Sequence, residues 1–287
     1  MTRARLWRSA VAVLLVTAAV APATAAVPRV ASYGLCADQM ALMLADRDQI
    51  VAVSDQATGP LSHYAARAKG LPVTRGSAEE IIASGAQVFL TSDNLNPYTA
   101  KALAQTNITV LTMPLANSWA DVEDLTRSVA RALQQSRRGE AILADMHRRL
   151  ERLARDKPAT LPRVVYYRPD GGGAGRGTFV DIAIEAAGFA NLQREIGIDG
   201  WRGVPLEKVV LSPPDAFITS YFDTNRRNAN FLRRNPVLWG TARLRPTIDV
   251  PGKYWNCGTP LLVLAAETMA NERKRLFPAT PAREARP

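Results

Sequence analysis

The chain has 287 residues, of which 47% are hydrophobic and 22% charged, and its formal net charge is +10. This hydrophobic fraction is typical of a folded globular chain and excludes a largely disordered one. The basic residues are scattered among acidic ones, without a block of Lys and Arg interleaved with aromatic residues. The composition therefore disfavours a nucleic-acid-binding protein.

Residues 1–26 have the layout of a cleavable secretory signal. Arg3, Arg5 and Arg8 make the start positive, residues 10–20 are apolar, and small residues follow Pro22. The apolar run is shorter than the roughly 20 residues that a transmembrane helix needs, so it favours a cleaved signal over an anchor. About 260 residues then remain, with a charge of +7 because three basic residues leave with the signal. We expect a periplasmic protein without a lipid anchor, since the first cysteine lies well past the signal.

Short apolar strands alternate with helices from residue 27 onward. The pattern predicts strands at 29–32, 50–54, 86–91 and 108–113, and helices at 38–45, 78–84 and 98–105. Such alternation is typical of a parallel sheet with helices on its faces.

The stretch 121–157 has no strand signal. It is rich in charge and carries apolar residues at helical spacing, so we expect helices here. Gly139 is expected to divide the stretch, and the second helix should end before Pro158.

The alternation then resumes, with strands expected at 163–168, 215–220 and 247–250 and helices at 180–187, 206–210, 228–233 and 260–275. The predicted fold class is α/β, with two small lobes of mostly parallel sheet joined by one long helix. We assign residues 27–138 to the first lobe, 139–158 to the connecting helix, 159–277 to the second lobe and 278–287 to a flexible tail. A ligand is expected between the lobes, where strand carboxyl ends face each other.

Segments in both halves carry a family resemblance through their order and spacing over some 250 residues. They are residues 30–32 with 36–40, 48–54, 76–83 with 87–90, 175–179 with 182–188 and 191–192, 206–210 with 214–218, and 255–260. Together they resemble the helical-backbone periplasmic binding proteins for ferric siderophores, haem and vitamin B12. The family usually has Pro-Asp before its third strand, where this chain has Ala86 and Gln87, a departure confined to the turn.

The resemblance implies the substrate-binding component of an ABC importer, a monomer without a cofactor of its own and without enzymatic activity. Its cargo would be an iron chelate or cobalamin, and its partner an inner-membrane ABC permease. Glu79 and Glu207 stand at matching places in the two lobes, where such glutamates dock onto permease arginines in this family. Ordinary solvated helix charges are the alternative interpretation.

The two cysteines allow three interpretations. Cys36 and Cys257 each lie next to a predicted helix near the expected ligand site, one in each lobe. They could form a disulfide, line the pocket as small side chains, or bind a soft metal, although two sulfurs alone are an incomplete metal site. A periplasmic metallochaperone, or a cysteine-dependent enzyme that also uses His63, are the alternative functions.

The remaining ligand candidates lie in loops after strands and near the cysteines. The full candidate set is Tyr33, Cys36, Asp55, Tyr98, Arg168, Trp201, Tyr221, Trp255 and Cys257. Aromatic rings suit a bulky planar cargo, and Arg168 with Arg176 favours an anionic iron chelate over a near-neutral corrinoid.

Other chemistries find little support in the motifs. A bare metal ion is disfavoured because the chain has only His63 and His147. The glycine-rich stretch 171–177 is a weak nucleotide signal, and we interpret it as a mobile loop at the ligand site. No His-Glu-x-x-His, Gly-x-Ser-x-Gly or Walker motif is present in the sequence.

Overall fold

The computed structural model describes residues 27–92, 95–168, 171–218 and 236–278. The expected signal segment, the helix at 228–233, Tyr221 and nearly all of the tail lie outside these ranges. Within them, none of the helices is long and apolar enough to cross a membrane.

The first lobe contains a four-stranded parallel sheet in the order β2-β1-β3-β4. Its strands are β1 (Val30–Tyr33), β2 (Ile50–Ala52), β3 (Val88–Thr91) and β4 (Thr109–Thr112). Its helices are α1 (Leu35–Leu44), α2 (Ala65–Ala68), α3 (Ala78–Ala83) and α4 (Pro97–Leu103), with 3-10 turns η1 (Arg47–Gln49) and η2 (Asp55–Thr58). The predicted strands and helices of this half are confirmed to within a few residues.

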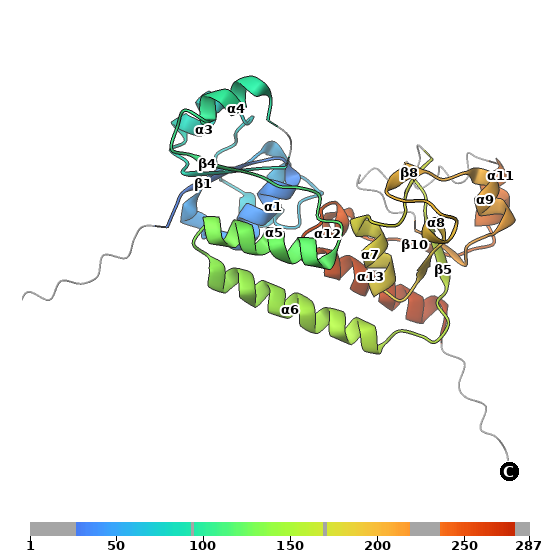
Figure 1. The fold of residues 1–287 in the computed structure, drawn as a ribbon. Coiled ribbons are helices and arrows are strands. Elements are labelled where there is room, and N and C mark those ends of the chain that lie inside the picture. The colour runs from blue at the N-terminus through green and yellow to red at the C-terminus, as the bar shows by residue number, and fades with distance from the viewer. Residues whose placement is uncertain (1–26, 93–94, 169–170, 219–235, 279–287) are drawn as a thin grey trace, which may run out of the picture.

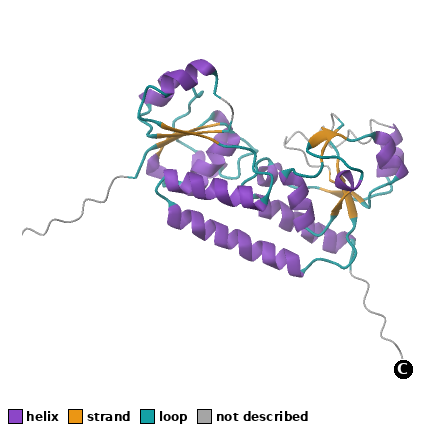
Figure 2. Cartoon of the chain, in the orientation of Figure 1, coloured by secondary structure: helices purple, strands orange, loops and turns teal. Residues whose placement is uncertain are grey.

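Helices cover both faces of this sheet (Figures 1 and 2). Alternate strand residues point to opposite faces, so Val30 and Val88 pack against α1, whereas Ala31 and Phe89 pack against α3 and α4. The central strand β3 is therefore buried on both faces, which explains why its residues Val88, Phe89 and Leu90 are apolar in succession rather than alternating.

Two long helices, α5 (Trp119–Ala132) and α6 (Ser136–Arg155), run side by side beneath the lobes (Figure 1). The predicted division at Gly139 is wrong: the chain turns at Gln134, which has a left-handed φ of 55°. Gly139 lies inside α6, where a Cβ atom would stand 2.7 Å from the Cβ of Ala130 in α5. The glycine is there because the two helices approach closely.

The second lobe repeats the plan with a parallel sheet in the order β10-β9-β5-β7. Its strands are β5 (Arg163–Tyr166), β7 (Ala190–Asn191), β9 (Ala216–Ile218) and β10 (Thr247–Ile248), and β6 (Gly172–Ala174) pairs antiparallel with β8 (Trp201–Gly203). Its helices are α7 (Phe179–Ala186), α8 (Leu192–Glu195), α9 (Leu206–Leu211), α11 (Pro236–Ala242), α12 (Gly252–Trp255) and α13 (Leu262–Leu276).

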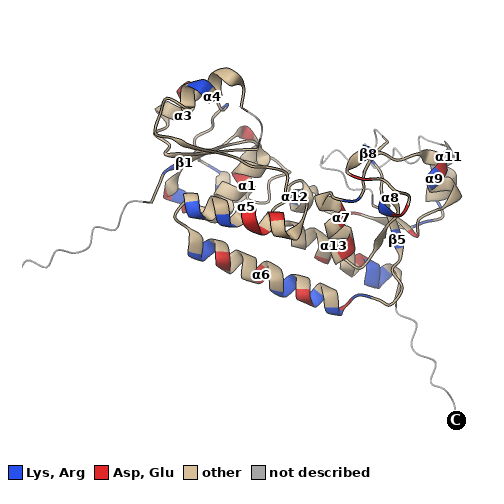
Figure 3. Cartoon of the chain, viewed as in Figure 1, with Lys and Arg blue, Asp and Glu red and all other residues tan. Residues whose placement is uncertain are grey.

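One hydrophobic cluster joins the long helices to the second lobe. Leu143 and Met146 of α6 pack in the same core as Ile184 of α7 and Met269 of α13. Acidic and basic residues are interleaved along α6 (Figure 3), and its Arg149 pairs with Glu267 of α13 at 2.8 Å. The observed helix, α6, thus spans both lobes, three residues earlier in the chain than the 139–158 segment expected.

Candidate functional site

The carboxyl ends of the central strands mark the place where such folds bind ligands. In each sheet the chain leaves the first strand in one direction and returns on its other side, which puts the switch point between β1 and β3 and between β5 and β9. Tyr33 ends β1, and Arg168 follows the end of β5. These are the ends from which the ligand site is expected to be built.

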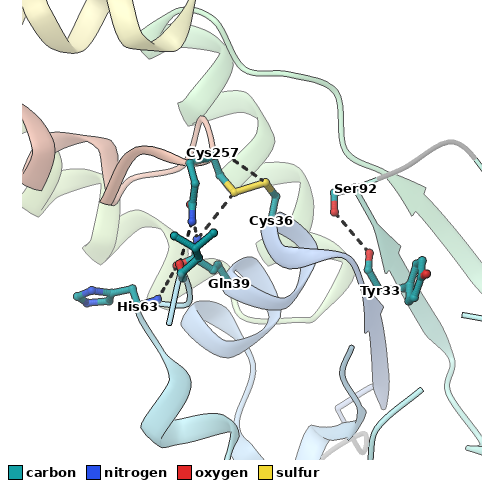
Figure 4. The surroundings of a disulfide bond; sticks show 8 residues. Tyr33, Cys36, Gln39, His63, Ser92 and Cys257 are labelled. Carbon is teal, nitrogen blue, oxygen red and sulfur yellow. Dashed lines mark hydrogen bonds between the residues drawn. A yellow bond between two sulfur atoms is a disulfide. The ribbon is translucent and has the colours of Figure 1, made fainter. Parts of the chain in front are cut away.

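Cys36 and Cys257 form a disulfide between the lobes (Figure 4). Cys36 lies in the first turn of α1, directly after β1, and Cys257 follows α12, which comes after β10. Their Cα atoms are 5.7 Å apart although 221 positions separate them in sequence. Of the three interpretations, the disulfide is the one observed. Metal binding by free thiols does not fit this state.

Polar contacts surround the disulfide and cross between the lobes. The Gln39 side-chain amide donates to Asn256 Oδ1 at 3.0 Å and contacts Cys257 Sγ at 3.8 Å. Asn256 Nδ2 donates to the Leu61 carbonyl oxygen at 2.8 Å, and the His63 backbone N–H donates to Gln39 Oε1 at 3.1 Å. Sequence reasoning missed Gln39 and Asn256; their positions one turn after Cys36 and directly before Cys257 were the available signal.

His63 lies in this contact region, on its first-lobe side. Its ring centroid is 4.9 Å from that of Tyr64 and 5.6 Å from that of Tyr254 in α12. Burial, with a smaller effect from Lys253, lowers the pKa of His63. The imidazole is therefore held in its neutral form, packed among aromatic rings.

Three further predicted ligand residues, Tyr33, Arg168 and Trp201, have partly exposed side chains. The Tyr33 ring lies over Gly76, where a Cβ atom would approach the ring to 2.7 Å. The Trp201 ring packs at 5.0 Å from Phe179. Asp55 is exposed at the start of η2, on the β2 side of the disulfide.

Two other candidates lie elsewhere. Tyr98 is 87% exposed on α4, the helix that packs beside α3 on the outer face of the first sheet. Trp255 is 0% exposed, and its ring packs edge-on to Tyr166 with centroids 5.3 Å apart. Trp255 is therefore a core residue in this conformation, because α12 directs its ring beneath β5.

The glycine-rich stretch is not the loop that was expected. Residues 172–174 form β6 and pair with β8. A Cβ atom at Gly173 would stand 1.8 Å from Gln193 Nε2, and one at Gly175 would stand 2.0 Å from the Ile198 carbonyl oxygen. Close backbone packing, rather than phosphate binding, explains why glycines stand at these two positions.

Charged groups near the site do not assemble into a metal centre. Over residues 27–278, apart from the undescribed gaps, no three His, Cys, Asp or Glu side chains cluster as metal ligands. His147 instead pairs with Glu123 at 2.7 Å between α6 and α5. Arg176 lies 3.7 Å from Asp199, which offsets the positive charge that favoured an anionic cargo.

The model of the periplasmic binding protein family matches residues 30–242. A cobalamin-binding protein of Halobacterium salinarum is 29% identical over 256 residues, covering 85% of this chain and 68% of that protein. The heme-binding protein RhuT of Roseiflexus sp. RS-1 has the same fold, with a TM-score of 0.69 and 24% identity over 85% of this chain and 98% of that one. A periplasmic binding protein of Veillonella parvula reaches a TM-score of 0.72 at 17% identity, covering 87% and 92%.

The vitamin B12 binding protein BtuF of Vibrio cholerae also matches, with a TM-score of 0.66 and 16% identity over 88% of this chain and 99% of that one. These solved structures confirm the predicted fold of two α/β lobes and helical backbone. Because the family model spans most of the chain, the resemblance seen in the sequence is also confirmed, and the chain belongs to the periplasmic binding protein family.

Proposed function

We propose that this protein is the substrate-binding component of an ABC importer, capturing a metal-containing macrocycle or chelate between its lobes. The observation that carries the proposal is the meeting of the two lobes at the carboxyl ends of their strands, where the disulfide joins them. Ligands of open α/β sheets bind at such ends. The family membership supports transport rather than catalysis.

Cobalamin is the cargo that we favour. The Halobacterium relative is named a cobalamin-binding protein, and its similarity extends over 85% of this chain. Tyr33 and Trp201 supply partly exposed rings that suit a large planar macrocycle. A ferric siderophore is the second candidate, supported by Arg168, since a guanidinium pairs well with anionic chelate oxygens.

A ligand panel tests the cargo. Protein lacking residues 1–26 would be mixed with cyanocobalamin, haemin, a ferric siderophore, or cobalt and iron salts, and its thermal unfolding recorded. A ligand at 100 times its Kd stabilises the folded state by about 2.7 kcal/mol. We expect a raised Tm with cyanocobalamin and none with the bare salts. Stabilisation by the siderophore alone would favour the second candidate, and no shift with any chelate would contradict the proposal.

Glu79 and Glu207 are our proposed contacts to the permease. Both are exposed, on α3 and α9, the helices that precede the equivalent strands β3 and β9. The backbone N–H of Glu79 and the Ser77 hydroxyl hold the pKa of Glu79 below its usual range, so it is charged at neutral pH. Three residues after each glutamate stands an exposed apolar residue, Ile82 or Val210. Each lobe thus offers one carboxylate beside one apolar side chain.

Charge reversal tests this docking. The E79R/E207R variant should bind cargo like the wild type but lose association with the permease in nanodiscs, because the like charges repel. D48R, at an exposed position in η1, is the control. Equal loss of association in the control would mean that docking does not depend on these two glutamates.

The export route is also part of the proposal. We infer that the signal, residues 1–25 or 1–26, is removed during secretion and that a monomer works in the periplasm. N-terminal sequencing of the protein recovered from the periplasm should begin at residue 26 or 27. An intact amino terminus in the membrane fraction would contradict this.

The metallochaperone and cysteine-enzyme alternatives require thiols that the disulfide occupies. They predict bound metal, or turnover, that appears only after reduction. Metal analysis of reduced and oxidised protein separates them from the transport proposal.

A further inference from the structure

The disulfide lies at one edge of the space between the lobes. In the first sheet β2 is an edge strand, and in the second sheet β10 is an edge strand. The segment after β2 contains Leu61 and His63, and the segment after β10 contains Tyr254 and Asn256. These two segments contact each other beside the disulfide.

We call this set of cross-lobe contacts the seam. It consists of Cys36, Gln39, Leu61, His63, Tyr254, Asn256 and Cys257. Beside it, Gly258 fits so closely against the connection between β4 and α5 that a Cβ atom would stand 2.2 Å from the Ala116 carbonyl oxygen. The seam therefore combines one covalent bond with hydrogen bonds, ring contacts and close backbone packing.

The ligand candidate Tyr33 lies on the side of the disulfide opposite His63. Tyr33 is the last residue of β1, and Ser92 comes directly after β3. Figure 4 shows both on one side of the disulfide and His63 on the other. Ser92 contacts the Tyr33 carbonyl oxygen through its backbone N–H at 3.2 Å. The disulfide thus separates the side filled by His63 and Tyr254 from the side where Tyr33 and Ser92 mark the switch point of the first sheet.

We propose that the Cys36–Cys257 disulfide is a covalent strap that holds the lobes at one edge, and that a dithiol reductant can open it by attack at Cys36. The strap would fix the separation of the two lobes at the ligand site before cargo arrives. Lobe motion would then be confined to the side of the disulfide on which Tyr33 and Ser92 lie. The part that concerns cargo rests on the function proposed above. The part that concerns lobe separation does not.

Accessibility gives the exchange reaction a direction. Cys257 is 2% exposed, whereas Cys36 is partly exposed. A thiolate of the reductant attacks Cys36 Sγ, the sulfur–sulfur bond breaks, and the electron pair leaves on Cys257 Sγ, which the Gln39 amide contacts at 3.8 Å. The second thiol of the reductant then displaces Cys36. The products are two protein thiols and the oxidised reductant.

The strap predicts a measurable change in lobe separation. Spin labels would be attached to K101C and K208C, exposed positions on α4 and α9, in the wild-type and C36S/C257S backgrounds. Double electron–electron resonance measures the distance between the two labels. It should give one narrow distance distribution with the disulfide and a broader one, extended to longer distances, without it. The same distribution in both backgrounds would overturn the strap.

A second measurement serves if the serine variant folds poorly. Folded wild-type protein would be reduced, alkylated and measured by small-angle scattering against unreduced protein exposed to the same alkylating agent. The radius of gyration should increase only after reduction. No increase, in protein shown by mass to carry both alkyl groups, would also overturn the strap.

The cargo arm uses cyanocobalamin as the probe. If breaking the strap leaves about one tenth of the molecules in the binding arrangement, the apparent affinity falls roughly tenfold. Unchanged affinity with broadened distances would show that the strap does not prepare the site. If neither form binds cyanocobalamin, the cargo proposal fails while the distance measurement still decides the strap.

The site of attack has its own test. Oxidised protein would be exposed briefly to glutathione, quenched with acid and mapped by peptide mass. The glutathione adduct is expected on Cys36. An adduct on Cys257 would reverse the direction of exchange.

Discussion

Replacing Trp255 by alanine should destabilise the protein by about 3–5 kcal/mol, the usual range for removing a large aromatic side chain from a core. The side chain is fully buried and its ring packs against Tyr166. In a chain of this size each kcal/mol lowers the Tm by roughly 2–4 °C, so the midpoint should fall by roughly 6–20 °C. Thermal and urea unfolding, followed by circular dichroism, measure the change.

Trp201→Ala is the matched control, because the same residue type is partly exposed there and contacts Phe179. This variant should lose only about 1 kcal/mol of stability but bind cyanocobalamin more weakly. Trp255→Ala, measured at a temperature where it is folded, should keep its affinity. The reverse pattern, with an unchanged midpoint and lost affinity in Trp255→Ala, would show that Trp255 contacts cargo and does not belong to the core.

Three further predictions concern the interior of the lobes and their interface. Gly258→Ala forces a Cβ atom towards the Ala116 carbonyl oxygen and should destabilise the protein by about 1–3 kcal/mol, measured by urea unfolding, whereas wild-type stability would contradict the close approach. Burial raises the pKa of Asp38 above its usual 3.8, so the folded protein holds this proton to higher pH than the unfolded chain does. The stability linked to Asp38 is then greatest below pH 3.8 and is lost as the pH rises through the folded pKa. D38N should therefore gain stability relative to wild type as the pH rises from 3.8 through the folded pKa. A difference in stability between the two proteins that does not change with pH would count against this. Arg273 donates to the Ala187 carbonyl oxygen at 2.9 Å from a buried position, and R273M should cost about 1–3 kcal/mol, with no loss in the exposed R275M control.

The secondary structure followed from local patterns. Each described strand of the two parallel sheets lies within or next to a predicted strand, except β7, whose residues Ala190 and Asn191 belong to no apolar run. Helix ends were less well predicted, because Gly139 reads as a helix breaker until its contact with Ala130 is known. The glycine-rich stretch reads as a loop for the same reason, since the close approach of Gln193 and Ile198 is invisible in sequence.

The candidate site was predicted only in outline. Tyr33, Arg168 and Trp201 stay predictions, made because loops after strands gather at one edge of a parallel sheet. Tyr98 and Trp255 follow the same rule in sequence, yet one ring is exposed on an outer helix and the other is buried. Which way a loop residue points depends on the neighbours that fill the space beside it, and these come from distant parts of the chain.

Hydrophobic spacing and local order were enough to predict the alternation of strands and helices, the two-lobed α/β class and the resemblance to a binding-protein family. The folded arrangement was needed to show that Cys36 and Cys257 meet, that Gln39 and Asn256 join them, and that Trp255 belongs to the core. Two sulfurs separated by 221 positions come within bonding distance only if both lobes are placed correctly relative to each other. That placement is set by the packing of α5, α6 and α13 as a whole, and no short segment of sequence contains it.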